Sequence, residues 1–161
     1  NLGPVVKLSA AEFIINQMNK ALDKGAKKMI DENKFHFPKE HKNYLIPQVL
    51  TNVSHEMDFM TEETFGPCVG IMKVSGENEA VKLMNDSPYG LTASIWTNDI
   101  GVAEKIGNQV QTGTFFMNRC DYLDPALSWT GVKETGKGCS LSEIAYEKLT
   151  APKSFHLRKG Q

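Results

Sequence analysis

The chain has 161 residues, of which 40% are hydrophobic and 23% are charged, and its formal net charge is −1. This composition is typical of a folded domain with a core, and its balanced charge argues against nucleic acid or a membrane as a partner. Its three cysteines (Cys68, Cys120 and Cys139) are odd in number and widely spaced, which argues against a disulfide framework or a metal site and favours a cytoplasmic location.

The first elements expected along the chain are a helix and two extended segments. Ser9 and Glu12 have the spacing of a capping box, and Gly25 can end the helix in a left-handed conformation. Residues 26–30 and 44–53 have the character of extended segments. The buried face of the helix would consist of Ile14, Met18, Ala21 and Leu22.

Short apolar runs then alternate with helical patterns. We expect strands at residues 68–74, 91–97 and 112–118, the first of them buried. A helix should follow the first strand, with Ala80, Val81 and Met84 facing inward. Asn98 or Asp99 can cap a second helix, whose inward residues would be Val102, Ala103, Ile106 and Val110. This alternation predicts an α/β fold with a mainly parallel sheet flanked by helices.

The C-terminal part should contain an irregular stretch, a helix and a last strand. Residues 119–139 have no regular pattern. Ser140 and Glu143 have capping-box spacing and would open a helix that stops before Pro152. Residues 153–159 alternate as a half-buried strand does, with Phe155 and Leu157 on one face.

The stretch GVKETGKG, residues 131–138, has the spacing of a phosphate-binding loop. Such a loop needs Ser or Thr where this chain has Gly138, and it should directly follow a strand, which is not expected here. We therefore favour the alternative that its three glycines adopt backbone conformations closed to other residues. Lys133 and Lys137 would then be packing or surface residues.

Six segments of the chain resemble motifs of the aldehyde dehydrogenase family. They are LGPVV, NYLIPQVL, EETFGP, NDSPYGLTASIWTND, QTGTFFMN and WTGVKETGKG. Because they occur in the family's order and nearly at its spacing, the whole chain resembles about the last third of such an enzyme. Residues 1–152 would be the C-terminal part of the catalytic domain, with that domain's α/β fold. Residues 153–161 would be the terminal strand, which joins subunits into a homo-oligomer.

The resemblance implies covalent chemistry with NAD or NADP. In this family a Cys attacks the aldehyde to form a thiohemiacetal, a hydride passes to the dinucleotide, and a Glu activates water to hydrolyse the thioester. None of the three cysteines here matches the motif of the nucleophile. We therefore expect the nucleophile, the base and the dinucleotide-binding domain in upstream segments. No catalytic residue is assigned to this chain, and the chain alone should be inactive.

Two residues of EETFGP are implied to contact the cofactor. Glu63 matches the glutamate whose carboxylate accepts hydrogen bonds from the nicotinamide ribose, and Phe65 matches the aromatic residue near the nicotinamide. The alternatives are a solvated loop charge for Glu63 and a core aromatic for Phe65. Glu62 is expected to be a solvated loop charge. The choice between NAD and NADP stays open.

Residues 119–131 match the loop that lines the family's aldehyde entrance. Leu123 and Trp129 are the implied substrate-pocket residues, although Trp129 could equally be an ordinary packed indole. Arg119, Asp121 and Asp124 depart from the usual loop, which leaves the aldehyde open. The four histidines show no metal-site pattern. The alternative function is a non-catalytic, truncated paralogue that acts as a structural or interaction module.

Overall fold

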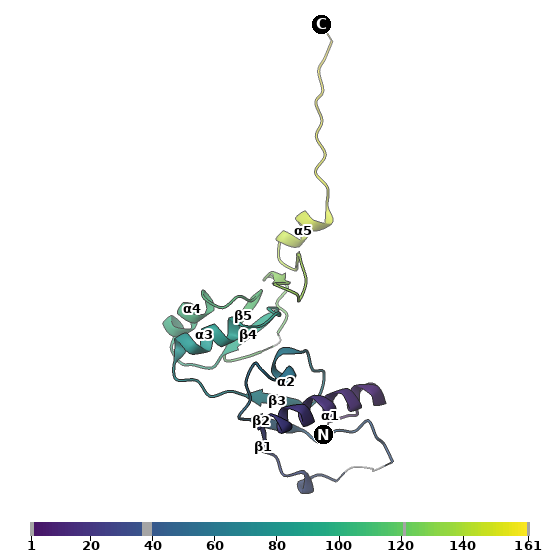
Figure 1. The fold of residues 1–161 in the computed structure, drawn as a ribbon. Helices are drawn as coiled ribbons and strands as arrows, with labels where there is room; N and C mark the ends of the chain where they lie inside the picture. The colour runs from purple at the N-terminus through teal and green to yellow at the C-terminus, as the bar shows by residue number, and fades with distance from the viewer. Residues whose placement is uncertain (1, 37–39, 121, 161) are drawn as a thin grey trace. The chain divides into compact units, whose positions relative to one another are not determined.

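A computed structural model of the chain describes residues 2–36, 40–120 and 122–160. The chain forms two compact units, Asn1–Val74 and Ser75–Gln161, and each contains a parallel strand pair with helices (Figure 1). The expected α/β class with parallel pairing is therefore confirmed. No helix in these described ranges is both long and apolar enough to cross a membrane.

The first unit contains a three-stranded sheet in the order β1-β2-β3 and, among its described residues, three helical segments, of which α1 is the longest. Its strands are β1 (Lys27–Lys28), β2 (Gln48–Thr51) and β3 (Cys68–Ile71), and its helices are α1 (Leu8–Asp23), the 3-10 turn η1 (Glu32–Lys34) and α2 (Asp58–Thr61). β2 pairs with β1 in antiparallel and with β3 in parallel register. The prediction of a buried strand at β3 is wrong, because Val69 and Ile71 are each 54% exposed.

Helix α1 ends as the sequence predicts but does not begin that way. Gly25 adopts φ +100°, and its N–H donates to Leu22 while Ala26 N–H donates to Ala21, which together form a Schellman ending. At the other end the capping-box prediction is wrong. The extended residue before the helix is Lys7, so Ser9 lies inside the first turn and caps nothing.

The predicted face of α1 forms the core of the first unit. Ile14 of α1 and Leu50 of β2 are fully buried and belong to the same core cluster. The core cluster consists of Ile14, Met18, Ala21, Ala26, Leu50, Val53, Met57 and Phe59. Leu22 packs against this cluster while staying half-buried.

The second unit repeats the strand-helix alternation. Its elements are α3 (Glu77–Asn85), β4 (Thr92–Ile95), α4 (Ile100–Gly107) and β5 (Thr114–Met117), and β4 and β5 are parallel (Figure 1). The Asp99 carboxylate accepts the Val102 N–H at 3.0 Å, which confirms Asp99 as the cap of α4. Of the predicted inward residues of α3, Met84 is exposed, so that part of the prediction is wrong.

A short hairpin and a short helix complete the second unit. The hairpin pairs β6 (Trp129–Thr130) with β7 (Cys139–Ser140), so the stretch expected to be irregular contains two strands, and α5 (Ile144–Leu149) follows. The second capping-box prediction is also wrong. Leu141 and Ser142 have positive φ, which separates Ser140 from the helix, and Glu143 makes no side-chain cap.

The predicted last strand is not formed in the described part of the chain. Residues 151–160 belong to no helix or strand and run as an exposed extended segment beyond α5 (Figure 1). Phe155 and Leu157 are 71% and 86% exposed. A strand with no partner leaves its N–H and C=O groups unpaired, so a strand here would need an edge from elsewhere.

Candidate functional site

The EETFGP loop connects α2 to β3 and is held at both ends by the backbone. Glu62 N–H donates to Asp58 O at the end of α2, and Pro67 O accepts from Gln48 N–H at the start of β2. The end of the loop is therefore attached to β2, the strand that contributes Leu50 to the core of the first unit.

The middle of this loop is held by a side chain of α1. Gln17 Nε2 donates to the Glu62 carboxylate at 3.2 Å, and Gln17 Oε1 accepts from the Thr64 hydroxyl at 2.6 Å. Glu62 is exposed, as expected of a solvated loop charge, and it also accepts this one hydrogen bond. Sequence reasoning missed Gln17, although a polar residue on the apolar face of a helix was the available signal.

Gly66 brings the loop against the core. A Cβ at this position would lie 2.5 Å from Ile14 Cδ1, so a larger residue would require the Ile14 side chain to move. Glu62, Thr64 and Gly66 therefore contact α1, and the residues between them face solvent.

Glu63 and Phe65 are exposed residues of the loop, as is Glu62. Phe65 is 81% exposed, which excludes its interpretation as a core aromatic of this unit. The Glu63 side chain is exposed, and within the described part of the chain it makes no hydrogen bond or ion pair. Both carboxylate oxygens of Glu63 can accept hydroxyl donors from a ligand.

Of the three cysteines, Cys68 lies in surroundings that do not favour a nucleophilic thiolate. Burial raises the pKa of the Cys68 thiol, which disfavours the thiolate that acts as a nucleophile. Cys120 is exposed, and Cys139 is half-buried at the start of β7. Among the residues that the structure describes, no three His, Cys, Asp or Glu side chains gather as a metal site.

The loop after β5 borders a small cavity within the second unit. Its volume is about 130 Å³, and Trp129 lines it together with Phe116 and Tyr122. The Arg119 guanidinium lies 3.8 Å above the Tyr122 ring, in cation–π geometry. Leu123 is exposed and does not line this cavity, so Trp129 has the better-defined position. Asp121 lies outside the described residues.

The glycine-rich turn after β6 has a structural role. Lys133 Nζ donates to the carbonyls of Asn85 and Ser87, at 2.7 and 2.9 Å, so this lysine is a packing residue as predicted. Gly136 and Gly138 have φ of +143° and +93°, which confirms the backbone explanation for these two glycines. Gly131 has no positive φ, and a Cβ there would instead lie 2.6 Å from the Gly136 carbonyl carbon.

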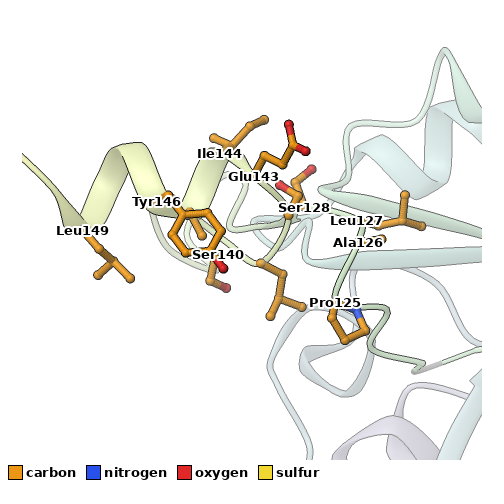
Figure 2. A pocket seen from close by; sticks show the side chains of 12 residues that line it. Pro125, Ala126, Leu127, Ser128, Ser140, Glu143, Ile144, Tyr146 and Leu149 are labelled. Carbon is orange, nitrogen blue, oxygen red and sulfur yellow. The ribbon is translucent and has the colours of Figure 1, made fainter.

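An open apolar groove lies beside α5. Figure 2 shows that its lining comes from the loop around Pro125 and from α5, with Tyr146 and Leu149 projecting from the helix. The groove measures about 960 Å³, and both projecting side chains are exposed.

Residues 1–155 match the aldehyde dehydrogenase family. This chain belongs to that family. The chain is 30% identical over 151 residues to the 3-sulfolactaldehyde dehydrogenase of Priestia aryabhattai, an alignment that covers 93% of this chain and 30% of the relative. The chain therefore spans about a third of the length of this relative.

Two solved aldehyde dehydrogenases superpose closely on the chain. Betaine aldehyde dehydrogenase from Staphylococcus aureus, in complex with NAD⁺, has a TM-score of 0.79 at 30% identity and is matched over 91% of this chain and 29% of its own. Succinic semialdehyde dehydrogenase from Streptococcus pyogenes, in complex with NADP⁺, has a TM-score of 0.78 at 29% identity, over 91% and 31%. Aldehyde dehydrogenases are NAD(P)-dependent oxidoreductases, so family membership leaves the choice of dinucleotide open.

Proposed function

We propose that this chain is the C-terminal portion of an NAD(P)-dependent aldehyde dehydrogenase that oxidises an aldehyde to a carboxylic acid. The observation that carries the proposal is the EETFGP loop. Gln17 of α1 forms hydrogen bonds with Glu62 and Thr64. The Glu63 carboxylate between them is exposed and has no partner among the described residues. Residues 1–152 would complete the catalytic domain.

Glu63 and Phe65 fit a nicotinamide ribose. A carboxylate accepts two hydroxyl donors at once, and an exposed aromatic ring beside it can flank the nicotinamide. When bound, the dinucleotide supplies the hydride acceptor. The role of Glu63 is to fix the ribose, and with it the distance over which the hydride moves.

The aldehyde would be bound by the loop after β5. Trp129 lines the cavity of the second unit, and Leu123 lies exposed in the same loop. We propose both as substrate-pocket residues, Trp129 within the cavity and Leu123 at its approach.

This chain would supply no catalytic residue. The half-buried Cys68 has a raised pKa, and none of the three cysteines matches the motif of the family's nucleophile. The 161-residue chain should therefore not reduce NAD⁺ or NADP⁺ when incubated with a panel of aldehydes. Steady absorbance of the reduced cofactor above a buffer control would overturn this assignment.

The central test replaces Glu63 by Gln in the complete enzyme. This change keeps the shape but exchanges one acceptor oxygen for a donor, so single-turnover hydride transfer should slow by about tenfold or more. Cysteine-dependent hydrolysis of p-nitrophenyl acetate needs no ribose contact and should change little. The exposed Glu12 on α1 supplies the control variant Glu12→Gln. Unchanged hydride transfer in Glu63→Gln would reduce Glu63 to a loop carboxylate.

Residues 153–161 would contribute an oligomerisation strand. The exposed Phe155 and Leu157 also favour the second candidate function, a non-catalytic module that docks on other subunits through this segment. Light scattering should give a larger mass for the 161-residue chain than for a version that ends at Ala151. Equal masses would contradict both uses of the segment. A cytoplasmic location stays a prediction from the cysteine pattern.

A further inference from the structure

We infer that Gln17 is a positioning residue, whose buried side chain fixes the loop on both sides of Glu63 and so sets the direction of the Glu63 carboxylate. The two hydrogen bonds of Gln17 support its effect on the conformation of the loop. The consequence for hydride transfer rests on the proposed function of Glu63.

The Gln17 side chain is suited to hold two partners. It is 2% exposed, and its amide uses one end as donor to Glu62 and the other as acceptor from Thr64. A buried amide pays a large desolvation penalty unless both ends are satisfied, so the two contacts support one orientation. Glu63 lies directly between these two partners in the chain.

The loop has little other support at this point. Within the described ranges, Glu63, Thr64 and Phe65 make no backbone–backbone hydrogen bond, although Glu62 N–H and Gly66 O on either side do. An extended three-residue segment without such bonds would sample several conformations. The two hydrogen bonds of Gln17 are therefore the main polar contacts that restrict the direction of residues 63–65.

The first experiment measures backbone order in the 161-residue chain. Gln17→Met keeps the length and apolar packing of the side chain but removes both hydrogen bonds. NMR order parameters of residues 63–65 should be close to those of rigid backbone in the unmodified chain and fall below about 0.6 in the variant. Disorder of these residues already in the unmodified chain would overturn the inference.

Gln48 provides a matched control. It has the same burial as Gln17 and lies in the same unit, but its side chain bonds to the backbone of Ile30 instead of the loop. Gln48→Met should leave the order of residues 63–65 unchanged. Equal loosening by both variants would indicate general destabilisation and would overturn the inference.

A second variant guards against misfolding caused by a change in α1. Thr64→Val removes one partner of Gln17 from a half-buried position at the loop, where the core is not altered. It should lower the order of residues 63–65 in the same direction as Gln17→Met. If it leaves their order unchanged, the hydroxyl contact does not position the loop.

The second experiment tests whether Gln17 acts through Glu63 in the complete enzyme. Gln17→Met should slow single-turnover hydride transfer by about tenfold, with little effect on p-nitrophenyl acetate hydrolysis. The same change should have almost no further effect when Glu63 is already Gln, because the group that it positions is gone. Additive effects of the two changes would overturn the positioning role.

The two experiments separate failure of the inference from failure of the proposed function. If Glu63→Gln leaves hydride transfer unchanged, the cofactor role fails and the catalytic consequence for Gln17 is overturned with it. The order parameters still decide whether Gln17 fixes the loop. If Glu63→Gln slows the reaction but Gln17→Met does not, Glu63 keeps its function and the inference about Gln17 is wrong.

Discussion

The two units contain the same motif, a parallel strand pair with helices, but the strands are buried to different extents. In the first unit Leu50 of β2 is fully buried beneath α1. In the second unit every residue of β4 and β5 is only half-buried, and α3 contributes no buried residue. A shared motif therefore does not imply a shared source of stability, since burial of apolar area differs between the two.

Polar side chains join separate segments of the second unit. The Asn118 side chain bonds to the N–H and C=O of Thr97, and the Asn85 side chain joins the end of α3 to residues 109 and 111. Lys133 binds two further carbonyls. Such side-chain contacts each contribute about 1 kcal/mol, which is less than a large core residue does.

The largest expected effect is in the core of the first unit. Leu50→Ala should lower the free energy of unfolding of that unit by about 3 to 5 kcal/mol, because it removes a fully buried side chain. Amide exchange of β2 measures this unit. Both tryptophans of the chain, Trp96 and Trp129, lie in the second unit, so their fluorescence should show an unchanged urea transition.

Two further variants test whether amide exchange of β2 and tryptophan fluorescence report on separate cores. Ile106→Ala in α4 should move the tryptophan transition, and Leu157→Ala at an exposed position should move neither signal. A shift of the tryptophan transition by Leu50→Ala as large as that by Ile106→Ala would show that the units do not have independent cores.

Glycine-to-alanine substitutions should distinguish a position that faces rigid backbone from one that faces a side chain able to move. A Cβ at Gly113 in the second unit would collide with the backbone carbonyl of Thr130, so Gly113→Ala should lower that unit's stability by about 3 kcal/mol or more. At Gly66 the obstacle is the end of the Ile14 side chain, which can rotate, so Gly66→Ala should cost about 1 to 2 kcal/mol. Urea denaturation measures both.

Gly3 is the control for this pair. A Cβ there meets nothing within 4 Å, so Gly3→Ala should change stability by less than about 0.5 kcal/mol. If Gly66→Ala lowers stability more than Gly113→Ala does, the contact of Gly113 with the Thr130 carbonyl is not the more rigid of the two.

Thiol reactivity should also differ between the units. Burial raises the pKa of Cys68 in the first unit, so at pH 8, below that pKa, less of it is thiolate. Iodoacetamide should label the exposed Cys120 faster than Cys68. Peptide mass spectrometry measures both rates. They should converge in urea, and a difference that persisted in the unfolded chain could not be due to burial.

The smallest expected effect concerns helix capping. Asp99→Ala removes the carboxylate that accepts the Val102 N–H, so the second unit should lose about 1 kcal/mol by the tryptophan transition. Lys7 occupies the corresponding position before α1 but makes no side-chain cap, so Lys7→Ala should be nearly neutral. Equal effects would show that α1 depends on a cap that the structure does not contain.

The candidate site was only partly predictable. The EETFGP motif identified Glu63 and Phe65, and the structure leaves both exposed as a ligand-contacting pair requires. The position of Gln17 on the apolar face of α1 was visible in the sequence, but its partners were not, because Glu62 and Thr64 lie 45 and 47 residues away along the chain. The relation of Glu63 and Phe65 to a cofactor stays a proposal.

The sequence by itself determined the features that depend on neighbouring residues. The apolar face of α1, the Gly25 ending and the Asp99 cap each involve contacts within a few positions of the chain. Only the tertiary structure decided whether β3 is covered, whether Ser9 and Ser140 cap helices, and whether the last segment pairs as a strand. The physical reason is that burial and pairing depend on a distant partner surface, which local propensity does not encode.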